Sequence, residues 1–252
     1  MNKRELGSSV KVPEVTFLFW LLKIAATTLG ETGGDAVSMS MNLGYLVSTA
    51  IFASIFIAAL LVQIRARKFH PVIYWVTIIA TTAVGTTLAD FADRSLGIGY
   101  AGGTTLLLTL LACSLFVWHR TMGTISVSSV NDSRSESFYW ITIMFSQTLG
   151  TALGDWTADS AGFGFGGGIV VFVALLSVVA ALYFWSRISR TFLFWAAFIL
   201  TRPLGAVVGD FLDKPLKEGG LALSRFSASA VLIVFMLVGV LCFRHRAAER
   251  AH

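Results

Sequence analysis

Eight apolar segments of similar length follow one another along the chain, separated by short polar stretches. They cover roughly residues 14–34, 44–64, 71–90, 100–118, 138–155, 166–186, 191–210 and 222–243. A helix needs about 20 residues to cross about 30 Å of hydrocarbon, whereas a membrane β-strand needs only about 10 with alternating polarity. The pattern therefore predicts eight transmembrane helices.

The composition supports lipid as the solvent of this chain. Hydrophobic residues make up 56% and charged residues 13% of the 252 positions, and the mean hydropathy is +0.77. A soluble domain is about 45–50% apolar and about 25% charged. The net charge of +5 does not indicate a nucleic-acid partner, because the basic residues form short clusters between apolar runs. Cys113 and Cys242 lie inside apolar segments and predict neither a disulfide framework nor a thiolate metal site.

Lys and Arg lie mainly in one set of loops and tails. That set contains Lys3, Arg4, Lys11, Arg65, Arg67, Lys68, Arg120, Arg134, Arg187, Arg190, Arg244, Arg246 and Arg250. The opposite set contains only Arg94, Lys214 and Lys217, with Arg225 near a helix end. Because cytoplasmic loops of membrane proteins are enriched in Lys and Arg, we expect both termini to be cytoplasmic.

Four tryptophans mark an internal repeat: Trp20, Trp75, Trp140 and Trp195. A glycine follows each by ten residues, an aspartate by fifteen and a second glycine by twenty-four. We therefore divide the single membrane domain, residues 1–252, into two-helix repeats at about 13–66, 69–120, 136–188 and 189–245. Each copy contributes two spans, so all copies enter the membrane in the same direction. The expected fold is an all-α integral membrane protein, with four parallel repeats around a pseudo-symmetry axis along the membrane normal.

The repeat also carries a resemblance to a known family. The strings TTLGETGGD, TTLADFADRSLGIGY, SQTLGTALGDW and LTRPLGAVVGDFLDKP carry it. The chain resembles, over about residues 11–244, a bacterial family of multi-pass membrane proteins with four tandem copies of a two-helix repeat and a characteristic tryptophan. That family is catalogued as a repeat of unknown function. The resemblance implies the architecture and a place in the bacterial inner membrane, but no activity.

The first helix of each repeat carries a polar stripe. Positions seven, eleven and fifteen after each tryptophan lie four apart and therefore share one helical face. They are Thr27, Glu31 and Asp35; Thr82, Thr86 and Asp90; Gln147, Thr151 and Asp155; and Arg202, Ala206 and Asp210. Lys23 and Thr28 add to the stripe in repeat one, and Asp93, Asp159 and Asp213 form an outer acidic group. Because the second helices are almost wholly apolar, we expect the striped helices inside and the others facing lipid.

Small residues accompany the stripe at positions ten and fourteen. They are Gly30 and Gly34, Gly85 and Ala89, Gly150 and Gly154, and Gly205 and Gly209. Such spacing lets helix backbones approach closely in lipid. The alternative is that Gly30, Gly33 and Gly34 unwind the first helix and expose carbonyl groups. If the tryptophans form the cytoplasmic aromatic belt, Glu31 lies about 16 Å deep and the four repeat aspartates about 22 Å.

Charged residues at such depth cost about 3 kcal/mol or more, and they usually pair or line a pathway. Structural alternatives exist for each. The aspartates can be helix caps or face water at helix ends, and Glu31 can form a purely structural salt bridge with Lys23. Arg202, beside a kink expected at Pro203, can clamp an aspartate of another repeat. The threonines and Gln147 can bond to helix backbones.

Motifs for hydrolases, phosphate loops and dinucleotide sites are absent, so we expect neither an enzyme nor a resident cofactor. The leading hypothesis is a transporter or exchanger for a small hard cation, such as Mn²⁺ or another divalent ion; exchange of Mn²⁺ for protons is its most specific form. Asp35, Asp90, Asp155 and Asp210 would form its outer vestibule and Glu31 its deep ligand or proton carrier. Lys23 and Arg202 would be internal counter-cations.

Two other classes of function stay open. One is a channel or transporter for a small anionic or organic solute that binds Lys23 and Arg202. The other is a membrane scaffold or sensor that transports nothing, alone or as a homo-oligomer.

Overall fold

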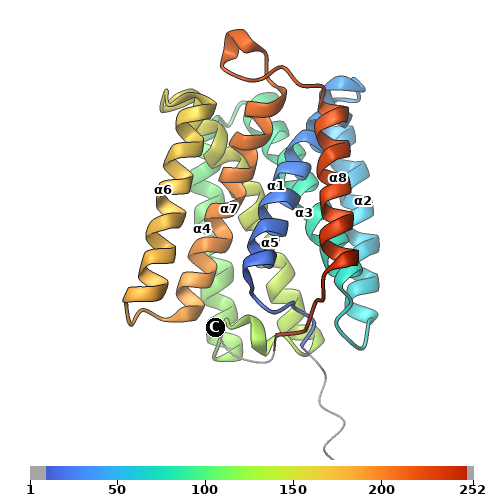
Figure 1. Ribbon diagram of the computed structural model, residues 1–252, viewed down its shortest axis with the longest axis vertical. Coiled ribbons are helices and arrows are strands. Elements are labelled where there is room, and N and C mark those ends of the chain that lie inside the picture. The colour runs from blue at the N-terminus through green and yellow to red at the C-terminus, as the bar shows by residue number, and fades with distance from the viewer. Residues whose placement is uncertain (1–9, 249–252) are drawn as a thin grey trace, which may run out of the picture.

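The protein is a helical bundle (Figure 1); the computed structural model describes residues 10–248. Its α-helices are α1 (Phe17–Asp35), α2 (Gly44–Arg65), α3 (Pro71–Asp90), α4 (Tyr100–Met122), α5 (Ser133–Asp155), α6 (Gly164–Trp185), α7 (Arg190–Asp213) and α8 (Arg225–Cys242). Within this range the only strand-like pairing is an isolated bridge between Pro13 and Ala247. Lys3, Arg4 and Arg250, which contribute to the predicted orientation, lie outside the described residues.

The eight expected helices are present, and six of them are long and apolar enough to cross a membrane. These six are α2, α3, α4, α6, α7 and α8. The other two are more polar, since α1 contains Lys23, Glu31 and Asp35 and α5 begins with the sequence SRSES. The chain therefore has the composition of a multi-pass membrane protein with two polar helices in its interior.

The odd-numbered helices form a closed inner ring. Helix α1 packs against α3, α3 against α5, α5 against α7, and α7 returns to α1. The even-numbered helices lie outside. In the most apolar stretch of Pro71–Ser95, which contains α3, 72% of the residues are buried, compared with 6% in the most apolar stretch of α2. Each outer helix packs chiefly on the inner helix of the next repeat, α2 on α3, α4 on α5, α6 on α7 and α8 on α1. The predicted division into inner and outer helices is confirmed.

Tight turns connect inner to outer helices after the repeat aspartates. In repeats one to three the turn is a single π-helical segment, η2 (Ala36–Ser40), η3 (Phe91–Ser95) or η5 (Trp156–Ser160). The second repeat glycine then adopts a positive φ, for example 74° at Gly44 and Gly99. No atom lies within 4 Å of a Cβ built on either glycine, so backbone conformation rather than space explains the glycine. In repeat four the helix runs on to Asp213, and a longer loop with η6 (Leu216–Glu218) follows.

The first repeat glycines provide the close approach between inner helices. A Cβ at each would overlap the residue seven after the tryptophan of the next repeat. The pairs are Gly30 with Thr82, Gly85 with Gln147, Gly150 with Arg202 and Gly205 with Thr27. Gly34, Gly154 and Gly209 similarly meet Thr86, Ala206 and Glu31. Helix α1 is continuous through Gly33, so the unwinding alternative is wrong.

The tryptophans do not form the expected belt at the lipid surface. Trp75, Trp140 and Trp195 are buried, and Trp20 is half-buried. They pack beside a second layer of buried rings, Phe19, Tyr74, Tyr139 and Phe194. The expectation fails because these rings pack between neighbouring inner helices, with centroid distances of 5.6 Å for Phe19–Trp75, 5.8 Å for Tyr74–Trp140 and 6.2 Å for Tyr139–Trp195. The aromatic side chains close one end of the bundle instead.

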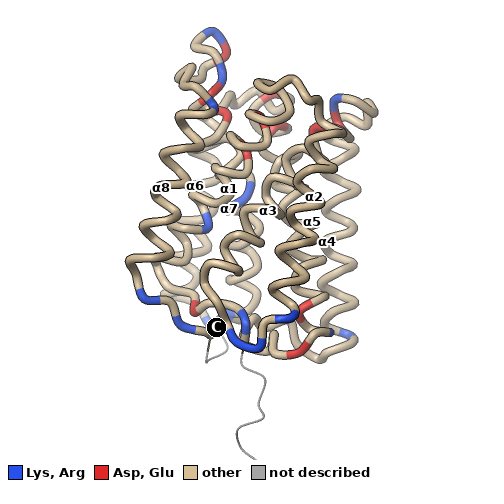
Figure 2. The backbone as a smooth tube through the Cα atoms, turned by 90° about the vertical axis from the view of Figure 1, so that its right-hand side faces the viewer, with Lys and Arg blue, Asp and Glu red and all other residues tan. Residues whose placement is uncertain are grey.

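That closed end is also the basic end of the molecule. Lys and Arg gather there together with both ends of the described chain (Figure 2). The N-terminal segment crosses it, and Lys11 Nζ lies 2.8 Å from a carboxylate oxygen of buried Glu136. Ala248 N donates to Val12 O at 2.9 Å, so the two terminal segments are joined. We call the opposite end, where the four repeat aspartates lie, the acidic end.

Candidate functional site

Polar side chains stack in layers along the inner ring, because they recur every four residues on each helix. Nearest the aromatic layer is a mostly apolar layer of Lys23, Ile78, Ile143 and Phe198. Next come Thr27, Thr82, Gln147 and Arg202, and then Glu31, Thr86, Thr151 and Ala206. The last layer, at the acidic end, contains Asp35, Asp90, Asp155 and Asp210. All of these side chains are buried.

A buried ion pair joins the four inner helices at mid-height. Arg202 Nη1 and Nη2 each donate to Glu31 Oε2 at 3.1 Å, and Nη2 also donates to Thr86 Oγ1 at 2.7 Å. The same nitrogen donates to Thr151 Oγ1. The expected clamp between Arg202 and an aspartate is therefore wrong, and so is the salt bridge between Glu31 and Lys23. The ring closes where α7 packs against α1. This contact brings Arg202, seven residues after the tryptophan of repeat four, against Glu31, eleven residues after the tryptophan of repeat one.

Several polar atoms near this pair have no hydrogen-bond partner within the described part of the chain. Lys23 is fully buried, and its Nζ makes no hydrogen bond within residues 10–248 but lies 4.2 Å from the ring centroid of Phe198. In the same range the amide of Gln147 and Nε of Arg202 are also unbonded. Buried polar atoms are rarely left unpaired, so these atoms mark a place for water or a ligand.

The threonines behave differently from Gln147. Thr27 Oγ1 donates to Thr201 O and Thr82 Oγ1 to Ala26 O, each at 3.2 Å, and Thr28 Oγ1 donates to Ile24 O at 3.0 Å. These hydroxyl groups bond to helix backbones, as the structural alternative expects. The amide of Gln147 does not.

The aspartates of the last layer are ion-paired across repeat boundaries. Arg94 Nε lies 2.9 Å from Asp90, and its Nη2 lies 3.2 Å from Asp155. Lys214 Nζ lies 3.0 Å from both Asp35 and Asp210. The expectation of caps or water-facing residues is wrong for these carboxylates. They are at most 4% exposed, and those of Asp35, Asp90 and Asp155 make no capping hydrogen bond to the turn that follows.

The outer acidic group is not one cluster. Asp213 joins Asp35 and Asp210, and one carboxylate oxygen from each of the three lies within 4.8 Å of the others. Asp93 is buried, and its carboxylate would collide with a Cβ placed at Gly103. Asp159 is exposed at the surface, with Tyr100 Oη 3.4 Å from its carboxylate.

Three cationic residues of this site were missed from the sequence, because they were used there only as evidence for the orientation of the chain in the membrane. They are Arg94, Lys214 and Arg225; Nε of Arg225 lies 3.1 Å from Asp213 and 3.7 Å from Asp35. A signal for two of them exists, because Arg94 and Lys214 each stand four residues after a repeat aspartate. Burial opposes the charge on Lys214, but the carboxylates of Asp210, Asp35 and Asp213 outweigh it and raise the pKa of this ammonium above its ordinary value.

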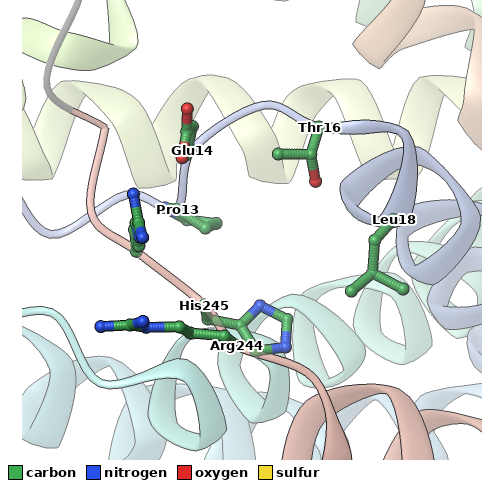
Figure 3. A pocket seen from close by; sticks show the side chains of 7 residues that line it. Pro13, Glu14, Thr16, Leu18, Arg244 and His245 are labelled. Atoms are coloured by element: carbon green, nitrogen blue, oxygen red, sulfur yellow. The ribbon is translucent and has the colours of Figure 1, made fainter.

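A surface pocket of about 250 Å³ lies elsewhere, at the basic end (Figure 3). The N-terminal segment and the C-terminal tail line it, with Pro13, Glu14, Thr16, Leu18, Arg244, His245 and Arg246. None of the polar layers of the inner ring contributes to this pocket. The candidate site is therefore the buried axis and its acidic end.

Comparison with known proteins gives a family but no activity. The family model described as a Repeat of Unknown Function (DUF347) matches four times, at residues 18–69, 73–124, 138–189 and 193–248. No curated protein and no solved structure matches the chain. The four matches cover most of the chain and agree with the four-fold repeat of helices, and the chain belongs to the DUF347 repeat family.

Proposed function

We propose that this protein is a membrane transporter or exchanger for a small hard cation, with eight helices across the membrane and both termini in the cytoplasm. One observation carries the proposal. Among the described residues at the acidic end, five buried carboxylates are ion-paired with only three cationic side chains, Arg94, Lys214 and Arg225. The carboxylates are Asp35, Asp90, Asp155, Asp210 and Asp213. Such an excess of negative charge attracts cations to the entrance of the ring.

The donor atoms favour a hard ion. The polar layers offer carboxylates, hydroxyl groups and one amide, which suit Mn²⁺, Mg²⁺, Ca²⁺, Na⁺ or H⁺. Arg202 lies beyond the aspartates on the same axis and opposes free passage of a cation, which favours a carrier over an open channel. Glu31 is then the residue that passes a proton or the ion across mid-height. We propose no resident cofactor and no catalytic role.

The second candidate is a carrier for a small anionic or organic solute. Its support is the set of unpaired donors on Lys23, Gln147 and Arg202. A scaffold that transports nothing explains the buried Arg202–Glu31 pair but not the unpaired atoms beside it.

Charge movement in proteoliposomes on a supported membrane tests the proposal. We expect a transient current for one hard cation, strongly reduced in Glu31→Gln and in Asp210→Asn. Asp159→Asn is the matched control, because Asp159 is acidic and near the same end but exposed. Silence across a panel of cations and pH jumps, with folded protein, would contradict the proposal. Solute uptake that Lys23→Met abolishes would favour the second candidate.

A further inference from the structure

The acidic end contains two versions of one ion-pair motif. Arg94 in repeat two joins Asp90 to Asp155, and Lys214 in repeat four joins Asp210 to Asp35. Arg94 and Lys214 stand at the same repeat position, nineteen after the tryptophan, where repeats one and three have Met39 and Asp159. The ring is four-fold in its helices but two-fold in these cations.

The two bridges differ in their chemistry. Arg94 contacts its two aspartates through different nitrogens, Nε and Nη2, so the planar guanidinium forms a fixed clamp. At the other bridge a single atom, Lys214 Nζ, lies 3.0 Å from Asp35 Oδ2 and 3.0 Å from Asp210 Oδ1. A compact ammonium held between two carboxylates occupies a position that suits a metal ion.

Only the Lys214 side has a third carboxylate in reach. Asp213 completes a group of three acidic residues whose ligand atoms lie within 4.8 Å of one another, and no other such group occurs among the described residues. Asp35 Oδ1 and Asp213 Oδ1 are both buried and have no hydrogen-bond partner within residues 10–248. Buried carboxylate oxygens without a partner point to an unfilled ligand position.

The charges favour a divalent ion. With Lys214 in place, the three carboxylates face two cationic groups, Lys214 and Arg225. A divalent ion in place of the ammonium would, together with Arg225, neutralise all three carboxylates.

The side chain of Lys214 can move away from Asp35 and Asp210 while its backbone stays in place. It directly follows α7, and its side chain is 12% exposed. Its backbone is fixed by a hydrogen bond from Ala222 N to Lys214 O at 2.9 Å, beside Gly220, whose Cβ would collide with the same carbonyl. Only the flexible side chain has to move.

We propose that Asp35, Asp210 and Asp213 bind the transported cation as a divalent ion, and that the Lys214 ammonium is a tethered competitor that fills this site when the ion is absent. The assignment rests on the proposed function and deepens it. The bridge of Arg94 between Asp90 and Asp155 is then a structural clamp that stays closed during transport.

Equilibrium binding of Mn²⁺ to the full chain in detergent, followed by the paramagnetic resonance of free Mn²⁺, tests the site. We expect Lys214→Met to bind one Mn²⁺ per chain at least about tenfold more tightly than the wild type. Adding Asp213→Asn in that background should abolish the gain. Arg94→Met is the matched control and should gain nothing; methionine is the residue that repeat one has at this position.

The outcomes separate the site from the proposed function. An unchanged affinity in Lys214→Met, or an equal gain in Arg94→Met, overturns the site even if wild-type liposomes carry a cation current. A gain specific to Lys214→Met supports the site even where no current is found, and the transport proposal then fails by itself.

A measurement on the wild type covers the case in which Lys214→Met does not fold. Mn²⁺ should displace the ammonium and so speed the labelling of Lys214 by an amine-reactive reagent, detected by mass spectrometry of the peptide. Exposed Lys217 is the internal reference. Labelling of Lys214 that Mn²⁺ leaves unchanged relative to Lys217 overturns the proposal.

Discussion

Two buried basic side chains in neighbouring layers of the inner ring have opposite surroundings. Arg202 donates to Glu31 and to two threonines, whereas Lys23 makes no hydrogen bond within the described chain and rests over Phe198. Breaking a buried pair leaves one charge uncompensated, and this usually costs about 3–5 kcal/mol. Removing a basic side chain that has no partner within the described chain carries no such cost.

We therefore expect Arg202→Met to lower the free energy of unfolding by about 3–5 kcal/mol, and the double variant with Glu31→Gln to recover most of that loss. Lys23→Met is the control and should be neutral or stabilising. Denaturant unfolding in mixed micelles gives the free energy of unfolding of the wild type, the two single variants and the double variant. Equal losses in Arg202→Met and Lys23→Met would contradict the importance of the ion pair.

Packing between elements depends on small residues at the contacts of the inner helices. A Cβ at Gly85 would lie 2.8 Å from the carbonyl carbon of Gln147, which belongs to the backbone of α5 and cannot move alone. A Cβ at Gly166, on the outer helix α6, would meet nothing within 4 Å. Replacing each glycine by alanine therefore separates two effects: the clash at a helix–helix contact, and the higher helix propensity of alanine.

Gly85→Ala should destabilise the protein by about 1–3 kcal/mol, because α3 and α5 must separate. Gly166→Ala should be neutral or stabilise it by up to about 1 kcal/mol, because alanine favours a helix. Thermal unfolding in one detergent compares them. No loss in Gly85→Ala would show that the approach of α3 to α5 is not tight, and an equal loss in Gly166→Ala would show that the loss does not come from this contact.

At the scale of the whole molecule, each outer helix covers the inner helix of the next repeat. The polar connection between α4 and α5 separates the chain into two halves, yet α4 packs on α5 and α8 packs on α1. In the first half alone, α1 therefore lacks the outer helix α8, and in the second half alone, α5 lacks the outer helix α4. The ring closes only when both halves are present.

Cutting the chain within residues 123–132 should give two fragments that assemble when they are produced together. With an affinity tag on the first fragment, we expect the second to co-purify in equal amount, and neither to give a monodisperse monomer alone. A first fragment that is a stable monomer by itself would contradict the interlocked arrangement.

Much of the architecture follows from the sequence by itself. Periodicity shows which face of a helix is polar, so residues such as Asp90 and Thr86 placed the odd-numbered helices inside. The glycines at fixed offsets indicated close packing and tight turns because only glycine tolerates them. Three residue types at the same offsets after four tryptophans predicted four tandem copies of one repeat, which the family match confirms.

The tertiary structure alone decided which residues meet. A helical period fixes a face but not the neighbour that face contacts, and Arg202 and Glu31 are 171 residues apart in sequence. The aromatic pattern does not show that rings of neighbouring inner helices pack on one another, so the burial of Trp75 and its equivalents was not foreseen. The role of Lys214 depends on ring closure, which brings repeat four against repeat one and places its ammonium between Asp210 and Asp35.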